Sequence, residues 1–133
     1  MSMRLAPFMA VFLLFITVEG RAAGAELTLP FEQESFEAMQ AEGRPILVDI
    51  SASWCPTCAR QHAVLEAIFE DGLYPDLVVL TVDYDDQRSV VRDFRAMRQS
   101  TLIVFRGDQE TGRAVAITSR EDIENLLDTA YAD

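Results

Sequence analysis

Two cysteines, Cys55 and Cys58, stand three positions apart after an apolar stretch, and the sequence contains no others. A Cys-x-x-Cys pair beside alternating strand and helix patterns is typical of a redox pair. A thiolate, and not a thiol, attacks a disulfide, so one sulfur needs a lowered pKa. The start of a helix lowers it, because free N–H groups and the helix dipole favour a negative sulfur there. We therefore predict Cys55 as an exposed nucleophile at a strand-to-helix turn, Pro56 in the first helical turn, and Cys58 as the resolving thiol.

An inert disulfide and a pair of buried thiols are the structural alternatives to a redox pair. A metal site is a further alternative, because two thiolates can hold Cu(I) or share Zn(II), and His62 follows Cys58 by one helical turn. Two or three ligands leave the shell of a metal incomplete, and a lone histidine on a helix is more often a surface or packing residue. We expect no cofactor and no resident metal. A copper- or zinc-binding carrier that uses Cys55, Cys58 and His62 is the alternative function.

Asp49 interrupts the apolar run that precedes the cysteines. Burial in that run would raise the pKa of its carboxyl group and let it accept a proton from Cys58 when that thiol must become a nucleophile. The alternative is a structural acid at a strand end, hydrogen-bonded to a neighbouring hydroxyl such as Ser51 or Ser53. The sequence favours the role of proton acceptor.

The first 25 residues differ from the rest of the chain. Arg4 precedes the apolar run Leu5–Val18, and Ala23-Gly24-Ala25 supplies the small residues that a signal peptidase accepts. The apolar run is shorter than the roughly 20 residues that a membrane-spanning helix needs. We expect a cleaved signal peptide at 1–25, with an uncleaved anchor as the alternative, and one domain at 26–133. Export would take the chain to a compartment in which disulfides persist.

The composition is strongly acidic, with 22 acids against 11 basic residues, all of them arginine, and a formal net charge of -11. Such a surface repels nucleic acid and anionic lipid, so neither is an expected partner. The arginines of residues 89–98 are expected on the solvated face of a helix.

Strand and helix patterns alternate along the chain. Ser35 is expected to cap the first helix, and Ser119 the last, with Asp122 completing a capping box. A further helix over residues 89–98 should bury Phe94 and Met97. The expected strands are 27–29, 46–50, 77–82, 101–105 and 114–117, and the helices lie between 35 and 43, 59 and 70, 89 and 98, and after 119. The fold class is therefore α/β, a central mixed sheet of four to five strands flanked by helices, with a parallel central portion and a final antiparallel hairpin joined by a turn over residues 106–112.

This order, with its motif, resembles the thioredoxin fold and its family of thiol-disulfide oxidoreductases over residues 26–133. Asp49 stands six residues before Cys55, where the family keeps a buried acid, and Trp54 precedes the first cysteine as in the Trp-Cys-x-x-Cys motif. Phe94 and residues 101–105 match the helix and strand that bring a substrate-contacting loop opposite the cysteines. The lead-in at residues 42–49 is similar to exported members that exchange electrons across the bacterial periplasm.

The chain departs from the family at three positions. Ser100 stands where the family has a cis proline, and a cis bond before a non-proline residue costs about 2.5 to 4 kcal/mol, so we expect the Gln99–Ser100 bond to be trans. Thr81 stands where many members have a lysine near the buried acid, and Ala116 replaces a glycine near the substrate groove.

The resemblance implies an exported thiol:disulfide oxidoreductase that exchanges the Cys55–Cys58 disulfide and dithiol with protein substrates through a mixed disulfide. A reductase is favoured over an oxidase. We expect a periplasmic monomer recharged by a membrane electron donor. Trp54 offers a flat apolar surface to a substrate chain, with simple packing as its alternative, and backbone groups of residues 99–101 would pair with an extended substrate. The predicted substrate-binding residues are Trp54, Pro56, Gln99, Ser100 and Thr101.

Overall fold

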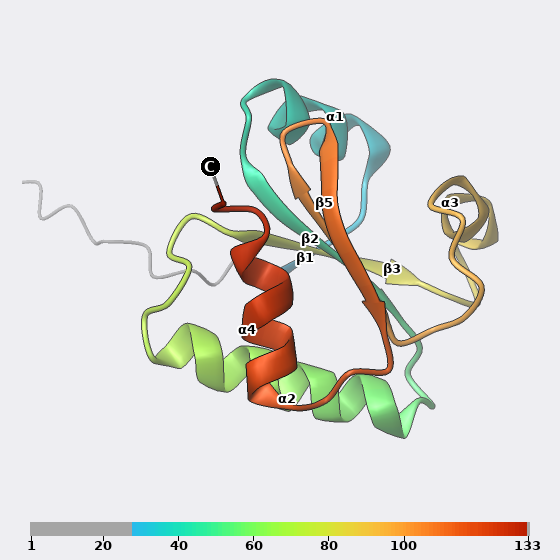
Figure 1. Ribbon diagram of the computed structural model, residues 1–133. Coiled ribbons are helices and arrows are strands. Elements are labelled where there is room, and N and C mark those ends of the chain that lie inside the picture. The colour runs from blue at the N-terminus through green and yellow to red at the C-terminus, as the bar shows by residue number, and fades with distance from the viewer. Residues whose placement is uncertain (1–27, 133) are drawn as a thin grey trace, which may run out of the picture.

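The computed structural model describes residues 28–132, and the predicted signal peptide lies outside them. Within these residues the strands and helices follow the order expected from the sequence (Figure 1). The elements are β1 (Thr28–Pro30), α1 (Gln33–Ala41), β2 (Pro45–Ser51), α2 (Pro56–Glu70), β3 (Val78–Asp83), α3 (Arg88–Asp93), β4 (Thr101–Arg106), β5 (Gln109–Val115) and α4 (Arg120–Asp128).

The five strands form one mixed sheet in the order β1-β3-β2-β4-β5. β1 and β2 run parallel to β3, whereas β4 runs antiparallel to both β2 and β5. The parallel portion therefore comprises three strands, and the antiparallel portion begins at β4. All seven residues of β2 are buried, as an apolar and β-branched run in the middle of a covered sheet should be.

Side chains of β2 alternate between the two faces of the sheet. Ile46 and Ile50 join an apolar core with side chains of α1 and α3. Leu47 joins a second core, with side chains of α2 and α4. The same alternation places Asp49 on the face that α2 covers, which is the face of the cysteine-bearing helix.

Phe94 belongs to the first core, where four phenylalanine rings pack with centroids 5.3 to 6.0 Å apart. The helix before it is shorter than predicted. α3 ends at Asp93, Arg95 adopts a left-handed backbone with φ of 53°, and the N–H of Ala96 bonds to the carbonyl of Val91. This C-terminal cap releases the chain before Met97, which is 90% exposed. The prediction of a buried Met97 was wrong.

Two element starts differ from the sequence prediction. α1 begins after Glu32, because the N–H of Phe36 already bonds to the Glu32 carbonyl, so Ser35 lies inside the first turn and is not its cap. β5 begins at Gln109 directly after a tight turn in which Gly107 has a positive φ of 57°. Its polar first half, which the sequence predicts as part of the turn, belongs to the exposed edge strand of the sheet. The cap of α4 is confirmed, since Ser119 Oγ accepts a hydrogen bond from the Asp122 N–H at 3.1 Å.

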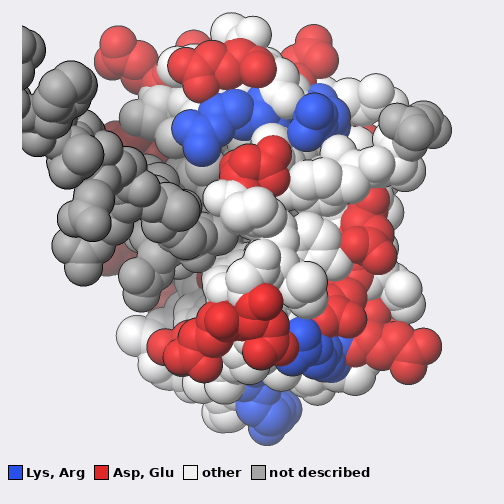
Figure 2. Space-filling view, turned by 90° about the vertical axis from the view of Figure 1, so that its left-hand side faces the viewer, with Lys and Arg blue, Asp and Glu red and all other residues white. Residues whose placement is uncertain are grey.

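Figure 2 shows one face of the molecule, on which arginines lie among more widespread acidic side chains. Among the ion pairs of the surface, Arg120 contacts the carboxylates of both Asp71 and Glu124. Such exposed pairs contribute little to stability, so they serve mainly to balance charge. Within residues 28–132 no helix combines the length and apolarity needed to cross a membrane.

Candidate active site

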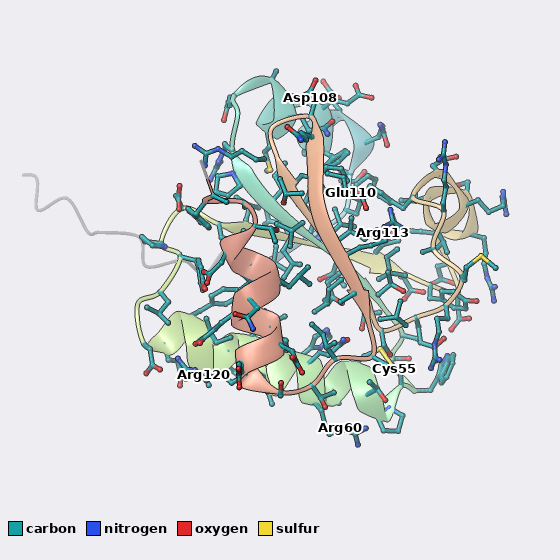
Figure 3. All side chains as sticks on the ribbon, viewed as in Figure 1. Cys55, Arg60, Asp108, Glu110, Arg113 and Arg120 are labelled. Carbon is teal, nitrogen blue, oxygen red and sulfur yellow. A yellow bond between two sulfur atoms is a disulfide. The ribbon has the colours of Figure 1, made fainter. Side chains whose placement is uncertain are left out.

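Cys55 and Cys58 form a disulfide at the N-terminal end of α2 (Figure 3). Cys55 is the N-cap residue, and its Sγ accepts a hydrogen bond from the N–H of Cys58 at 3.1 Å. Pro56 occupies the first turn, where its missing N–H has no helical partner to lose. The helix therefore presents unused N–H groups and its positive dipole end to the Cys55 sulfur, as predicted.

The predicted exposure of Cys55 was wrong. Cys55 is 5% exposed and Cys58 1% exposed, and both pack with Ala52 and Tyr84. The chain just before β4 also covers them, through Ser100. Burial opposes ionisation of a thiol, so hydrogen-bond donors at the sulfurs carry more weight here than at an open turn.

Ser100 is the residue that touches both sulfurs. Its Oγ lies 3.1 Å from Cys55 Sγ and 3.3 Å from Cys58 Sγ, and its side chain is fully buried. The peptide bonds of the described residues are all trans, in agreement with the prediction for Gln99–Ser100. Ser100 instead has a left-handed backbone with φ of 62°, which is uncommon for a residue other than glycine, asparagine or aspartate.

The left-handed backbone of Ser100 is held by two other elements. The N–H of Ala116, directly after β5, donates to the Ser100 carbonyl at 2.9 Å, and Ala116 itself has a positive φ of 59°. Gln61 of α2 donates from Nε2 to the same carbonyl at 3.3 Å and to the Ile117 carbonyl at 3.0 Å. Gln61 thus joins the cysteine-bearing helix to the chain just before β4 and to the chain just after β5.

Gln61 is not among the residues expected at the site, although the sequence carries a signal for it. The buried positions of α2 are Cys58, Gln61, Leu65 and Ile68, which recur at helical spacing. A polar residue that is fully buried on such a stripe needs hydrogen-bond partners inside the protein. The sequence could therefore have identified Gln61 as a buried residue that needs hydrogen-bond partners, but it does not show which groups those partners are.

Asp49 is 1% exposed, and its Oδ2 lies 2.6 Å from Nε2 of His62. Ser51 Oγ lies 3.4 Å from the same nitrogen, so the hydroxyl that had been considered as a partner of Asp49 contacts the histidine. The hydrogen bond to the carboxylate of Asp49 raises the pKa of His62, against the opposing effect of its partial burial. No protein group of the described residues bonds to Oδ1 of Asp49.

An open hollow of about 450 Å³ lies beside the disulfide. The disulfide, His62 and the edge strand β1 share it, together with the ends of β2 and β3. Its lining residues are Thr28, Leu29, Pro30, Ser51, Ala52, Ser53, Cys55, Cys58, Ala59, His62, Thr81, Asp83 and Gln87. Thr81, which stands where many members of the family have a lysine, belongs to this wall and supplies no cation to Asp49. His62 supplies the imidazole in its place.

The predicted substrate-binding residues differ in how far solvent reaches them. Trp54 is 58% exposed, and its Nε1 donates to Asp85 Oδ2 at 2.7 Å, so one edge is fixed while much of the ring is open. Gln99 is half-buried. Ser100 and Thr101 are buried, the Ser100 carbonyl is already bonded to Ala116, and Thr101 is paired with β2 and β5.

His62 is the third ligand of the alternative metal site that the sequence offers beside the cysteines. Among residues 28–132 no group of three or more histidine, cysteine or acidic side chains is arranged to hold a metal ion. The Nε2 atom of His62 is directed at Asp49.

The thioredoxin family profile matches residues 28–129. The chain belongs to the thioredoxin family. It is 30% identical over 98 residues to thioredoxin H2-1 of Oryza sativa subsp. japonica, a match that covers 72% of this chain and 67% of the relative. Its identity to the thioredoxin of Chlamydia trachomatis is also 30%, over 71% of this chain and 90% of the relative. The crystal structure of Trxlp from Edwardsiella tarda superposes with a TM-score of 0.72 and 38% identity, over 75% of this chain and 97% of that one.

These matches confirm the predicted thioredoxin fold and identify the chain as a thiol-disulfide oxidoreductase with a Cys-x-x-Cys pair. Members of this family act on protein thiols and disulfides. The roles of individual residues follow from the geometry above and are argued below as proposals.

Proposed function

We propose that this thioredoxin family member is an exported protein-disulfide reductase that works in the periplasm through a mixed disulfide on Cys55. The observation that carries the proposal is the Cys55 sulfur at the N-terminus of α2, bonded to the Cys58 N–H, with the carboxylate of Asp49 buried on the strand behind it. The signal-peptide pattern of residues 1–25 supports export.

The reaction is two successive exchanges. The Cys55 thiolate attacks one sulfur of a substrate disulfide; a bond forms between these sulfurs, the substrate disulfide breaks, and the other substrate sulfur leaves with the electron pair and takes up a proton. Cys58 then loses its proton and attacks Cys55 Sγ. The Cys55–Cys58 disulfide forms, the bond to the substrate breaks, and the second substrate sulfur leaves as a thiolate. Two electrons have passed to the substrate, and a membrane electron donor returns two electrons to the pair.

Asp49 is the group we assign to accept the proton of Cys58. It lies on the face of β2 that α2 covers, and its partner His62 lies in the wall of the same hollow as Cys58. A proton that reaches this carboxylate therefore has a polar route to solvent through a half-exposed imidazole. General base catalysis of this kind typically contributes 10² to 10⁴ in rate.

The surface for a protein substrate surrounds the exposed end of this site. Trp54 and Met97 are exposed, and Val115 is 46% exposed where β5 pairs with the start of β4. Because Ser100 and Thr101 are buried and bonded, we assign the backbone contacts to Gln99 and the apolar contacts to these three side chains and Pro56. We propose that the molecule acts as a monomer, and the reaction above needs no second copy because one chain carries both sulfurs and the carboxylate.

The trapping experiment compares Cys58→Ser with Cys55→Ser, each mixed with a protein that carries an accessible disulfide, such as insulin. Cys58→Ser should accumulate a mixed disulfide through Cys55 that reducing agent releases, and Cys55→Ser should trap markedly less. Equal trapping by both variants would contradict the assigned nucleophile. A variant that traps nothing while the native protein binds Cu(I) would favour a metal carrier.

The direction of electron flow is tested by the reduction potential of the Cys55–Cys58 pair, measured by equilibration with a glutathione or dithiothreitol buffer. A value near -270 mV is expected for a reductase, and one near -120 mV would indicate an oxidase. Export is tested by cell fractionation with mass analysis of the N-terminus. A periplasmic chain that begins at Glu26 supports the proposed cleavage, and a cytosolic chain with an intact N-terminus would contradict it.

A further inference from the structure

The Ser100 hydroxyl has the sulfurs as its only hydrogen-bond partners within residues 28–132. A hydroxyl carries one proton and can donate one hydrogen bond at a time. Its distances to Cys55 Sγ and Cys58 Sγ, 3.1 and 3.3 Å, differ little, so a small rotation of the hydroxyl proton changes which sulfur receives it.

We propose that Ser100 is a catalytic residue whose hydroxyl donates its hydrogen bond to whichever of Cys55 and Cys58 carries the negative charge. In the reduced protein that sulfur is Cys55. In the mixed disulfide Cys55 is bonded to the substrate sulfur and is neutral, so the hydroxyl turns to Cys58 as this thiol ionises and attacks. The inference rests on the proposed mixed-disulfide chemistry and adds a donor to it.

Burial increases the effect of this hydrogen bond on the stability of the thiolate. A thiolate at the position of Cys55, which is 5% exposed, has lost most of its hydration and needs donors from the protein. Two stand at hydrogen-bond distance, the Cys58 N–H and the Ser100 O–H, each 3.1 Å from the sulfur. A hydrogen bond to a charged sulfur is stronger than one to a neutral disulfide sulfur. The hydroxyl therefore stabilises the thiolate more than the oxidised pair, which lowers the pKa of Cys55.

The backbone conformation of Ser100 holds its hydroxyl against the sulfurs. A left-handed serine is strained, and it persists here because Ala116 and Gln61 bond to its carbonyl from two different elements. Those bonds fix the direction in which Cα–Cβ points, and the side chain ends against the sulfurs. A residue without a hydroxyl would keep the same backbone bonds and lose only the contact with the sulfurs.

The test is the pKa of Cys55 in the fully reduced protein, measured from the pH dependence of its alkylation by iodoacetamide with Cys55 identified by mass spectrometry. Ser100→Ala and Ser100→Gly both remove the hydroxyl, while glycine also relieves the left-handed strain. We expect the pKa of Cys55 to rise by about one unit in both variants, from the loss of one hydrogen bond to a charged group. Ser89→Ala, an exposed serine on α3, is the matched control and should leave it unchanged.

A Cys55 pKa that stays within about 0.2 units of the native value in both Ser100 variants would overturn the inference. A rise in Ser100→Gly alone would assign the effect to relief of the left-handed strain and would overturn it as well. If Ser100→Ala does not fold, the glycine variant decides the question, with a unit rise supporting the hydroxyl. This measurement needs no substrate, so it stands apart from the trapping experiment, whose failure would overturn the mixed-disulfide mechanism and leave the pKa result unaffected.

Discussion

The Nε2 atom of His62 lies 2.6 Å from Oδ2 of Asp49, and this pair joins helix α2 to the central strand β2 beside the disulfide. The carboxylate is almost fully buried, whereas the histidine side chain is 48% exposed. The pair is thus a buried acid with its partner at the surface of the hollow.

The stability of the fold should depend on the charge of His62. The Asp49 hydrogen bond raises the pKa of His62 above its ordinary value of 6.5. A group whose folded pKa exceeds its unfolded pKa stabilises the fold fully below the unfolded value, and this stabilisation disappears as pH rises through the folded value. We expect His62→Gln to lose more free energy of unfolding at about pH 5.5 than at about pH 9, as measured by urea denaturation. The effect should be modest because solvent screens the exposed imidazole.

His62 is the only histidine in the sequence, so its imidazole resonances can be titrated without ambiguity. The titration in the native protein should show a pKa above 6.5, and in Asp49→Asn it should fall back toward that value. Equal losses of stability at both pH values, or a titration that Asp49→Asn leaves in place, would contradict the coupling.

Replacement of the buried carboxylate should slow the second exchange more than the first. Asp49→Asn keeps the shape of the side chain but removes the proton acceptor that we assign to Cys58. The mixed disulfide should form at a near-native rate and resolve about 100-fold more slowly at neutral pH, near the lower end of general base catalysis. Acid quenching followed by mass spectrometry measures both steps.

The matched control for this variant is Asp93→Asn, because Asp93 is an exposed acid at the end of α3. It should leave both rates unchanged. A resolution rate in Asp49→Asn that equals the native rate would remove Asp49 from the mechanism, and the carboxylate would then be only a partner of His62.

The sequence predicted the position of Asp49 well and its partner poorly. Period-two alternation along β2 is enough to place Asp49 on one face with Leu47, and helical spacing places Cys55 at the start of α2. The link to His62 needs the rotation of α2 against the sheet, which depends on packing between distant segments. From the sequence alone, the histidine is grouped with the cysteines, its neighbours on the helix.

The direction of β4 also escaped sequence reasoning. Alternating strands and helices favour parallel strands, because a helix usually returns the chain to the opposite end of the sheet. The connection over residues 84–100, which includes α3, nevertheless stays at the end of the sheet where β3 finishes, so β4 starts beside the end of β2 and runs antiparallel to it. This return to the same end of the sheet brings Ser100 to the cysteines.

The position of Ser100 should depend on Gln61, which we regard as a positioning residue. Gln61→Met keeps the length of the side chain and removes both hydrogen bonds to the Ser100 and Ile117 carbonyls. We expect a loss of about 1 to 3 kcal/mol in the free energy of unfolding, because the half-buried Ile117 carbonyl loses a donor and the buried Ser100 carbonyl keeps only that of Ala116. The pKa of Cys55 should rise in the same direction as in Ser100→Ala, but by less.

Combining Gln61→Met with Ser100→Ala separates this role from a purely structural one. If Gln61 acts on the sulfur through the hydroxyl, the double variant should have the same Cys55 pKa as Ser100→Ala alone. Additive pKa shifts, or a loss of stability with an unmoved pKa in Gln61→Met, would show that the glutamine only holds the fold together.

Trp54 should affect protein substrates more than small ones. Its ring is mostly exposed beside the nucleophile, so Trp54→Ala should change the free energy of unfolding by about 1 kcal/mol or less. The ring would contact a substrate chain and not the reacting sulfur, so kcat/KM for a protein disulfide should fall roughly tenfold, mainly through a higher KM, as expected for loss of an aromatic contact. The rate with a small disulfide such as 2-hydroxyethyl disulfide should stay near the native value.

Asp85→Asn, which weakens the hydrogen bond to Nε1 and leaves the ring in place, is the control. If Trp54→Ala slows the reaction with both substrates equally, the ring acts on the disulfide itself and is not a docking surface. If Asp85→Asn reproduces the whole effect, the substrate is recognised through the fixed orientation of the ring and not through its apolar area.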